Sequence, residues 1–149
     1  MFDLNLPEYD IKLKKSDNTI LVWDELRRKY VVLTPEEWVR QHFVNFLITE
    51  RKYPKSLITN EKQVILNGQK KRCDTIVYNN LLMPLVIIEY KSPTIPITQM
   101  VFDQIARYNI VLKVDYLIVS NGLSHYCCKM DYSLQTYTYL SDIPFYTEL

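Results

Sequence analysis

The alternation of apolar and polar residues predicts a short β-hairpin near the start of the chain. Residues 9–15 (YDIKLKK) alternate between the two classes, residues 16–18 (SDN) favour a turn, and residues 19–23 (TILVW) have the composition of a returning strand. A basic stretch and a short apolar segment at residues 30–33 follow. We therefore expect residues 1–33 to form an N-terminal extension ahead of the main fold.

A long helix is predicted next, because three signals mark its start. Thr34 can cap the helix, Pro35 suits its first position, and Glu37 lies where it would complete a capping box. Beyond this start, apolar residues recur at helical spacing: Val39, Phe43, Phe46 and Leu47. Pro54 then ends the element near Arg51. The helix is expected to present one apolar stripe to a core.

Three strands, a second helix and a fourth strand are predicted after this helix. The Asn67-Gly68 pair is a strong hairpin signal, and residues 84–91 (PLVIIEYK) form the β-branched apolar run that is typical of a central strand. The strands are expected at residues 57–66, 72–78, 84–91 and 115–120, with the helix at residues 97–112 before the last of them. The tyrosine-rich residues 125–139 would add edge strands. This order predicts an α/β sandwich of helices around a mixed sheet.

Nothing in the sequence divides the chain into separate domains. Its 149 residues fit the usual size of one domain, and no repeat, low-complexity tract or glycine- and serine-rich linker interrupts them. We expect one domain over residues 1–149. Within it, residues 1–33 form the extension, residues 34–123 the α/β core and residues 124–149 additional C-terminal strands.

Composition and charge exclude several functional classes. Hydrophobic residues make up 48% and charged residues 23%, and the net charge of +1 excludes a strongly cationic nucleic-acid binder while allowing local basic patches. The only two glycines, Gly68 and Gly122, leave no room for a GxGxxG or P-loop motif. Two histidines and three cysteines without CxxC spacing make a structural zinc site or a disulfide framework unexpected.

The same features indicate the compartment. Reduced cysteines in an intracellular protein are the expectation for this cysteine pattern. Residues 1–10 carry acidic side chains and lack the apolar segment of a signal peptide. The longest apolar run, residues 81–88, falls well short of the roughly 20 residues that span a membrane. We expect a cytoplasmic protein with no membrane partner.

Two carboxylates and an amine form the most informative combination in the chain. Asp74 lies on one predicted strand, while Glu89 and Lys91, two residues apart, share a face of the next strand. A hairpin connection would bring Asp74 beside them. Carboxylate oxygens hold Mg²⁺, which neutralises a phosphate and acidifies a water, and a lysine can orient or deprotonate that water. The alternative is an exposed ion pair without a catalytic role, the usual state of a Glu-x-Lys sequence.

The position of these residues favours the metal site without excluding the ion pair. Glu89 and Lys91 follow a run that is expected to be buried on both faces, where each ion loses several kcal/mol of hydration free energy. A bound metal or phosphate would compensate this loss. Both interpretations remain open at this level.

The residues around Asp74 resemble the PD-(D/E)xK nuclease superfamily. Residues 71–93 (KRCDTIVYNNLLMPLVIIEYKSP) contain Asp74, fourteen intervening residues and then Glu89-Tyr90-Lys91. More narrowly, this segment is similar to the N-terminal nuclease segment of type I restriction enzyme restriction (R) subunits. Further similarities to that group and its stand-alone relatives are the Gln104-x-x-x-Tyr108 motif, Ser120-Asn121-Gly122, LTPEEWVRQ at residues 33–41, and Glu61. The resemblance covers nearly all of residues 24–123.

The resemblance implies a restriction-endonuclease-like αβββαβ core and a Mg²⁺-dependent DNA endonuclease that hydrolyses phosphodiester bonds. Asp74 and Glu89 would bind the metal together with the Tyr90 carbonyl, and Mn²⁺ could substitute for Mg²⁺. Lys91 would activate the water and stabilise the developing negative charge. Cys73 stands where the motif has its leading proline, a variation that should not remove activity.

Both helices offer further candidate site residues. Some relatives add a metal-binding glutamate from the first helix, and helical geometry places Glu36 on the side of the apolar stripe and Glu37 further round. A role of Glu36 at the helix dipole is equally consistent with its position. Gln104 and Tyr108 share one helix face and would flank the site, touching the substrate or Lys91. The alternative is that Tyr108 packs in the core and Gln104 lies at the surface.

Basic residues beside the site would bind the DNA backbone. The candidates closest to Asp74 in the sequence are Lys70, Lys71 and Arg72. Each of them is also compatible with an ordinary solvated charge. Glu61, which could face the same site, is expected on the strand surface.

Two functions follow as alternatives. The complete set of Asp74, Glu89 and Lys91 favours a Mg²⁺-dependent endonuclease, and whether it acts without a partner stays open. The near-neutral charge and the lack of a recognition domain favour a catalytically silent module, which binds DNA or another protein and needs a helicase or methyltransferase partner. The helicase motor of type I subunits is also missing from this chain. A homodimer would allow one site per chain to cut both strands.

Overall fold

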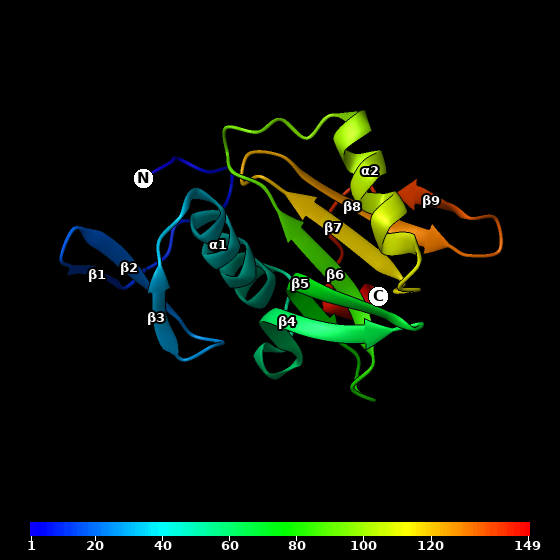
Figure 1. Ribbon diagram of the computed structural model, residues 1–149, viewed down its shortest axis with the longest axis horizontal. Coiled ribbons are helices and arrows are strands. Elements are labelled where there is room, and N and C mark those ends of the chain that lie inside the picture. Colours follow the sequence, from blue (N-terminus) through cyan, green and yellow to red (C-terminus); the bar gives the residue numbers. More distant parts are fainter.

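The computed structural model describes all 149 residues, and their strands form two separate sheets (Figure 1). The N-terminal sheet is antiparallel and contains β1 (Leu13–Ser16), β2 (Thr19–Asp24) and β3 (Lys29–Val32) in this order. The expected hairpin is therefore present, but its first strand begins at Leu13 rather than at residue 9. The apolar segment after the basic stretch adds a third strand.

The main sheet has six strands in the order β4-β5-β6-β7-β8-β9. Its strands are β4 (Ile58–Leu66), β5 (Gln69–Tyr78), β6 (Pro84–Tyr90), β7 (Tyr116–Ser120), β8 (His125–Asp131) and β9 (Thr136–Tyr139). Only β6 and β7 run parallel, so the sheet is mixed, as predicted. The α-helices are α1 (Pro35–Glu50) and α2 (Gln99–Ile110), and the 3-10 turns are η1 (Lys55–Leu57) and η2 (Tyr146–Glu148). Neither α-helix combines the length and the apolar character needed to cross a membrane.

Short-range signals in the sequence explain several of these boundaries. Thr34 Oγ1 accepts a hydrogen bond from the Glu37 backbone N–H at 3.0 Å, and Pro35 begins α1. The reciprocal half of the predicted capping box is not formed, because the Glu37 carboxylate binds arginine side chains instead. Asn67 and Gly68 have positive φ angles of 50° and 75°, which suit the tight turn between β4 and β5.

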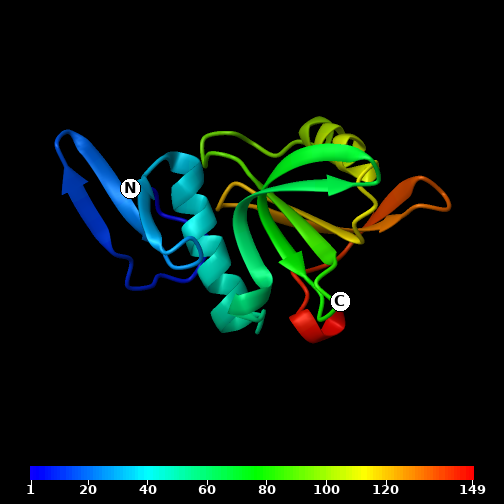
Figure 2. The same ribbon diagram turned by 60° about the horizontal axis from the view of Figure 1, so that its bottom comes forward.

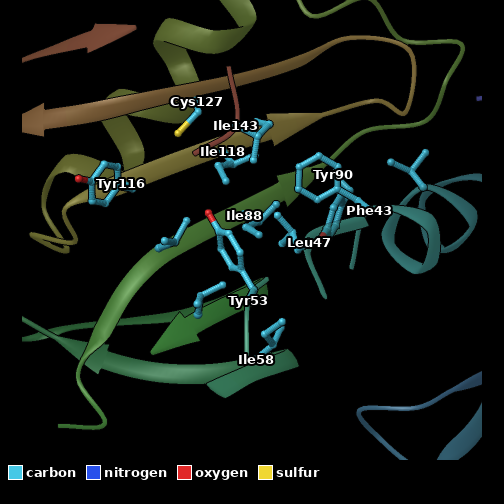
Figure 3. Close-up of a cluster of buried hydrophobic side chains, with 13 residues drawn as sticks. Phe43, Leu47, Tyr53, Ile58, Ile88, Tyr90, Tyr116, Ile118, Cys127 and Ile143 are labelled. Atoms are coloured by element: carbon cyan, nitrogen blue, oxygen red, sulfur yellow. The ribbon is translucent and has the colours of Figure 1, made fainter. Parts of the chain in front are cut away.

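The two α-helices cover opposite faces of the main sheet. A cluster of 13 buried residues on the α1 side includes Phe43 and Leu47 (Figure 3). A second cluster, of 11 buried residues, lies under α2 and includes Phe102. In β6, Ile88 belongs to the first cluster and Ile87 to the second, because successive side chains of a strand point to opposite faces. β6 is therefore buried on both faces, as expected for the central strand of an α/β sandwich.

Helix α1 lies between the N-terminal sheet and the main sheet (Figure 1, Figure 2). The first residues of the chain pack against it: Trp38 Nε1 donates to the Phe2 carbonyl at 2.9 Å, and the Asn5 N–H donates to the Gly122 carbonyl at 2.8 Å. Gly122 has a φ of +84°, and a Cβ there would lie 2.6 Å from Leu4 Cδ2. The positive φ favours glycine at this turn after β7, and the Leu4 side chain would have to shift to admit a larger residue.

Candidate functional site

The candidate site begins where β5 and β6 stop pairing. The antiparallel ladder between them includes the pair Thr75–Ile88. One step further in the same register, Asp74 stands opposite Glu89. Here the Tyr90 backbone N–H donates to Asp74 Oδ2 at 2.9 Å. The Asp74 side chain thus accepts a hydrogen bond that a backbone carbonyl accepts in a regular ladder. The predicted hairpin therefore brings the Asp74 and Glu89 carboxylates together.

The backbone around Asp74 is irregular on its other side, where β5 pairs with β4. The ladder skips the position at which Glu61 would pair with Asp74, and Glu61 has a φ of +54°, which is rare for a residue other than glycine. Arg40 of α1 fills this break. Its Nη1 donates to the Asp74 carbonyl at 2.7 Å and its Nη2 donates to Glu61 Oε1 at 2.6 Å. Arg40 thereby links α1 to the strand position that carries Asp74.

Glu89 is an enclosed acid with a positively charged neighbour. Lys71 Nζ donates to Glu89 Oε1 and to Asn109 Oδ1 of α2, in both cases at 2.6 Å. The same ammonium lies 4.5 Å from the centre of the Tyr108 ring. Burial, reinforced by the charge of Asp74, raises the pKa of Glu89 to about 7 even with Lys71 beside it. A divalent cation would stabilise both carboxylates in their ionised form.

A cleft of about 550 Å³ opens between this part of the sheet and α2. Its walls come from β5, from the end of β6 and from one side of α2. The predicted site residues among those that line it are Lys70, Lys71, Arg72, Glu89, Lys91, Gln104 and Tyr108. The structure thus brings together residues that lie far apart in the sequence, and Asp74 adjoins the cleft through Glu89.

Lys91 and the residues of α2 present different groups to this cleft. Lys91 is half-buried directly after β6 and forms no ion pair with a carboxylate of the chain. Gln104 and Tyr108 lie on the exposed side of α2, and Tyr108 is 62% exposed, so the alternative that Tyr108 packs in the core is wrong. The Tyr90 side chain is buried in the cluster under α1, which leaves only its backbone available to the site.

The three basic residues before Asp74 differ in their surroundings. Lys70 and Arg72 are exposed, whereas Lys71 is buried, although all three line the cleft. Arg72 also pairs with Glu61 at 2.7 Å, so Glu61 is held between two arginines. Lys71, expected as a surface contact for DNA, is instead held inside the cleft by Glu89.

The predicted orientation of Glu36 is wrong. Glu36 is exposed, whereas Glu37 is buried and accepts hydrogen bonds from Arg27 and Gln41. The apolar stripe does not reveal this, because α1 is covered by the N-terminal sheet as well as by the main sheet. Glu37 Oε2 also lies 3.0 Å from Arg40 Nε, and Arg40 Nη1 in turn donates to the Asp74 carbonyl. The structure therefore does not bring Glu36 to the carboxylate pair.

Two residues that organise the site have roles that the sequence pattern did not reveal. Arg40 is a charged residue of α1, but it is 7% exposed and points into the fold, where it donates to the Asp74 carbonyl. The sequence does carry a signal for Asn109, because it occupies the buried stripe of α2 with Phe102 and Ala106. A polar residue on a buried stripe needs a partner, and here the partner is Lys71.

The Asp74–Glu89 pair is the candidate ligand set for a cation. The structure contains no group of three or more histidine, cysteine, aspartate or glutamate side chains that could hold a metal ion. Two carboxylates suit Mg²⁺, which is usually bound by one or two carboxylates, several waters and the phosphate oxygens of a substrate. They do not suit a structural zinc ion, which requires four protein ligands.

Comparisons with known proteins agree with this architecture. Residues 35–144, which contain both α-helices and the whole main sheet, match the family described as Type I restriction enzyme R protein N terminus (HSDR_N). No curated protein matches the chain. A similar solved structure is a fragment of a protein described as an HsdR subunit of a type I restriction enzyme from Vibrio vulnificus YJ016.

The similarity to this solved structure concerns the fold. The TM-score is 0.52 at 21% sequence identity, and the match covers 75% of this chain and 24% of that chain. The chain thus spans about a quarter of the length of the solved HsdR chain that it matches. Because the family match extends over well more than half of the residues, the chain belongs to the family of type I restriction enzyme R protein N-terminal domains.

Proposed function

We propose that this domain is a Mg²⁺-dependent deoxyribonuclease that hydrolyses DNA phosphodiester bonds as part of a type I restriction enzyme. The observation that carries the proposal is the contact of two carboxylates, Asp74 and Glu89, at a cleft that also holds the unpaired amine of Lys91. The order α1-β4-β5-β6-α2-β7, with the carboxylates on β5 and β6, would make the core a restriction-endonuclease-like αβββαβ fold.

Asp74 and Glu89 would hold the cation through their carboxylates, with the main-chain carbonyl of Tyr90 as a third oxygen ligand. When bound, Mg²⁺ or Mn²⁺ would neutralise phosphate charge and lower the pKa of a water ligand. The Tyr90 N–H orients the Asp74 carboxylate from one side. Arg40 holds the Asp74 backbone from the other side, so the first ligand is fixed before any cation binds.

Lys91 lines the cleft without an ion-pair partner and follows Glu89 and Tyr90 directly, so it is the amine best placed to act on a reacting phosphate. Its ammonium would orient the attacking water and stabilise the negative charge that develops on the phosphate. Gln104 and Tyr108 face the cleft from α2 and would position the DNA strand. Lys70 and Arg72 would add contacts to the DNA backbone, which supply affinity without sequence readout.

A second candidate function is a catalytically silent module that binds DNA or a helicase or methyltransferase partner. Two observations favour it. The net charge of +1 gives little general affinity for DNA. The chain also spans only 24% of the similar HsdR chain, so other parts of such an enzyme would be needed for its complete reaction. If the domain is instead a nuclease, a homodimer would provide the second site that a double-strand cut needs.

A cleavage assay on linear duplex, single-stranded and branched DNA distinguishes these functions. We expect cleavage with Mg²⁺ or Mn²⁺, and we expect Asp74→Asn to lose both cation binding and cleavage while its amide oxygen still accepts from Tyr90. Lys91→Ala should keep cation affinity but slow cleavage by about 10²- to 10⁴-fold, because it removes only the group that handles the proton or the phosphate charge. Asp17→Asn, at the exposed β1–β2 turn, is the control.

The outcome that contradicts the nuclease proposal is equally concrete. If the unmodified chain binds DNA without cutting it, and calorimetry finds the same Mg²⁺ affinity in Asp74→Asn, the carboxylate pair is not a metal site. The silent module would then be the better description. Full activity of Lys91→Ala would assign that lysine a structural role only.

A further inference from the structure

Lys71 differs from the other basic residues that line the cleft, because it is the buried one among them. It is 9% exposed, whereas its neighbours Lys70 and Arg72 are exposed. A lysine is rarely buried without partners, since its ammonium loses its hydration. The surroundings of Lys71 therefore have to compensate a charge that a strand position alone would leave in water.

The compensation comes from two directions. On the sheet side, Glu89 Oε1 accepts from Lys71 Nζ at 2.6 Å. On the α2 side, Asn109 Oδ1 accepts at 2.6 Å, and the Tyr108 ring lies 4.5 Å from the ammonium. The two α2 partners are neutral and do not belong to the carboxylate pair. Asn109 and Tyr108 can therefore keep the ammonium in the cleft when Glu89 binds another positive charge.

A divalent cation on Glu89 conflicts with this arrangement. Mg²⁺ binds carboxylate oxygens at about 2.1 Å, which would place it close to an ammonium that already contacts the same carboxylate. Two positive charges at such a separation repel each other strongly in a partly buried site. The cation and the Lys71 ammonium are therefore alternatives at Glu89.

We propose that Lys71 is an internal counter-ion that competes with the divalent cation for Glu89, and that cation binding moves its ammonium toward a DNA phosphate in the cleft. This inference rests on the proposed function, because it takes Asp74 and Glu89 as the cation ligands. A phosphate oxygen can replace Glu89 as the acceptor, since both form charge-assisted hydrogen bonds with an ammonium. Cation and DNA should therefore strengthen each other's binding, and this coupling is reciprocal.

Mn²⁺ binding to charge-neutral variants of the full chain tests the competition. Lys71→Gln removes the charge but keeps a hydrogen-bond donor, and Lys62→Gln makes the same change at an exposed residue of β4. Free Mn²⁺ is counted by electron paramagnetic resonance at about pH 8, where Glu89 is ionised. We expect Lys71→Gln to bind Mn²⁺ about 10-fold more tightly than the unmodified chain, equivalent to about 1.4 kcal/mol. Lys62→Gln should match the unmodified chain.

A second measurement uses the unmodified protein, so that it does not depend on the folding of a variant. The Tyr108 ring shifts the NMR signal of the Lys71 side-chain εCH₂ group, because the ammonium lies over the ring. We expect this signal to move during a Mg²⁺ titration and to move further when a short DNA duplex is added. The signal is assigned by its loss in Lys71→Gln.

The outcomes separate the inference from the function on which it rests. If the unmodified chain binds Mn²⁺, then an equal or weaker affinity of folded Lys71→Gln, or a Lys71 signal that does not move, overturns the inference and leaves the metal site standing. If neither the unmodified chain nor Lys71→Gln binds Mn²⁺, the proposed metal site itself is wrong, and the inference fails with it.

Discussion

Lys71 and Lys91 have the same side chain and line the same cleft, yet their surroundings give them different roles. Lys71 is enclosed between Glu89 and Asn109, whereas Lys91 has no carboxylate partner. An amine that is already paired acts as a counter-ion, whereas an unpaired amine in the cleft that Glu89 lines is available for a substrate. The residue type therefore predicts the chemistry that is possible, and the neighbours decide which of the two amines can perform it.

The raised pKa of Glu89 makes the stability of the domain depend on pH. Its folded pKa of about 7 exceeds the ordinary value of 4.5, so between these pH values the folded state keeps a proton that the unfolded state has released. Stability should therefore fall as the pH rises through this window. Glu89→Gln should remove this fall. Urea unfolding at several pH values in the presence of a chelator measures it, and equal pH slopes in both proteins would refute the assignment.

At the scale of elements, one arginine joins α1 to the strands that carry the site. Arg40 contacts Glu37 on its own helix, Glu61 on β4 and the Asp74 carbonyl on β5. Glu61 adopts its unusual backbone conformation at this junction. The break in the β4–β5 ladder is therefore compensated by a side chain from another element, and it leaves Asp74 in a fixed position beside Glu89.

Arg40→Met should destabilise the domain strongly. The change leaves the buried Glu37 with fewer partners and releases Glu61, so we expect a loss of about 3 kcal/mol or more in the free energy of unfolding. Arg107→Met, on the exposed side of α2, is the control and should stay within about 0.5 kcal/mol. Urea unfolding compares them. Equal stabilities of the two variants would mean that the Arg40 network contributes nothing.

The docking of the N-terminal segment gives a second prediction at this scale. Gly122→Ala should destabilise by about 1–3 kcal/mol more than Gly68→Ala, because only the first substitution places a Cβ against Leu4. Both glycines have positive φ angles, so the backbone strain of alanine is common to the two variants. Thermal unfolding measures the difference. Similar melting temperatures would indicate that the N-terminal segment is not tightly packed in solution.

At the scale of the whole molecule, basic residues gather at the cleft although the net charge is only +1. Lys70, Arg72 and Lys91 line it, and Arg72 is exposed although it pairs with Glu61. Lys71 adds no free charge while it is buried and paired with Glu89. Contact with the DNA backbone should therefore depend on few charges. We therefore expect this domain alone to have little affinity for DNA.

The salt dependence of DNA binding tests this arrangement. If Lys70, Arg72 and Lys91 each contact one phosphate, a plot of the logarithm of the binding constant against the logarithm of salt concentration should have a slope of about −3. Lys70→Gln should make this slope shallower by about 1, whereas Lys14→Gln, on β1, should not change it. Fluorescence anisotropy with a labelled duplex measures the slope for the unmodified chain and for each variant. A slope that Lys70→Gln leaves unchanged would place DNA outside the cleft.

Local chemistry made much of the main fold predictable. The Thr34-Pro35 start of α1, the Asn67-Gly68 turn and the apolar run of β6 depend on residues that are close in the sequence, and the structure confirms all three. The antiparallel pairing of β5 and β6, which includes the pair Thr75–Ile88, also brings Asp74 and Glu89 together. Residues that are close in the sequence therefore specify the α-helices and strands of the main fold, their order and the position of the carboxylate pair.

Only the tertiary structure decided which charges face inward and which remain free. Glu37 rather than Glu36 is buried because the N-terminal sheet covers a second side of α1. Lys71 is a counter-ion because α2 places Asn109 above β5. These contacts join residues that lie far apart in the chain, and no local periodicity records them. Burial and charge pairing are properties of packed neighbours, and they become determined only when separate elements meet.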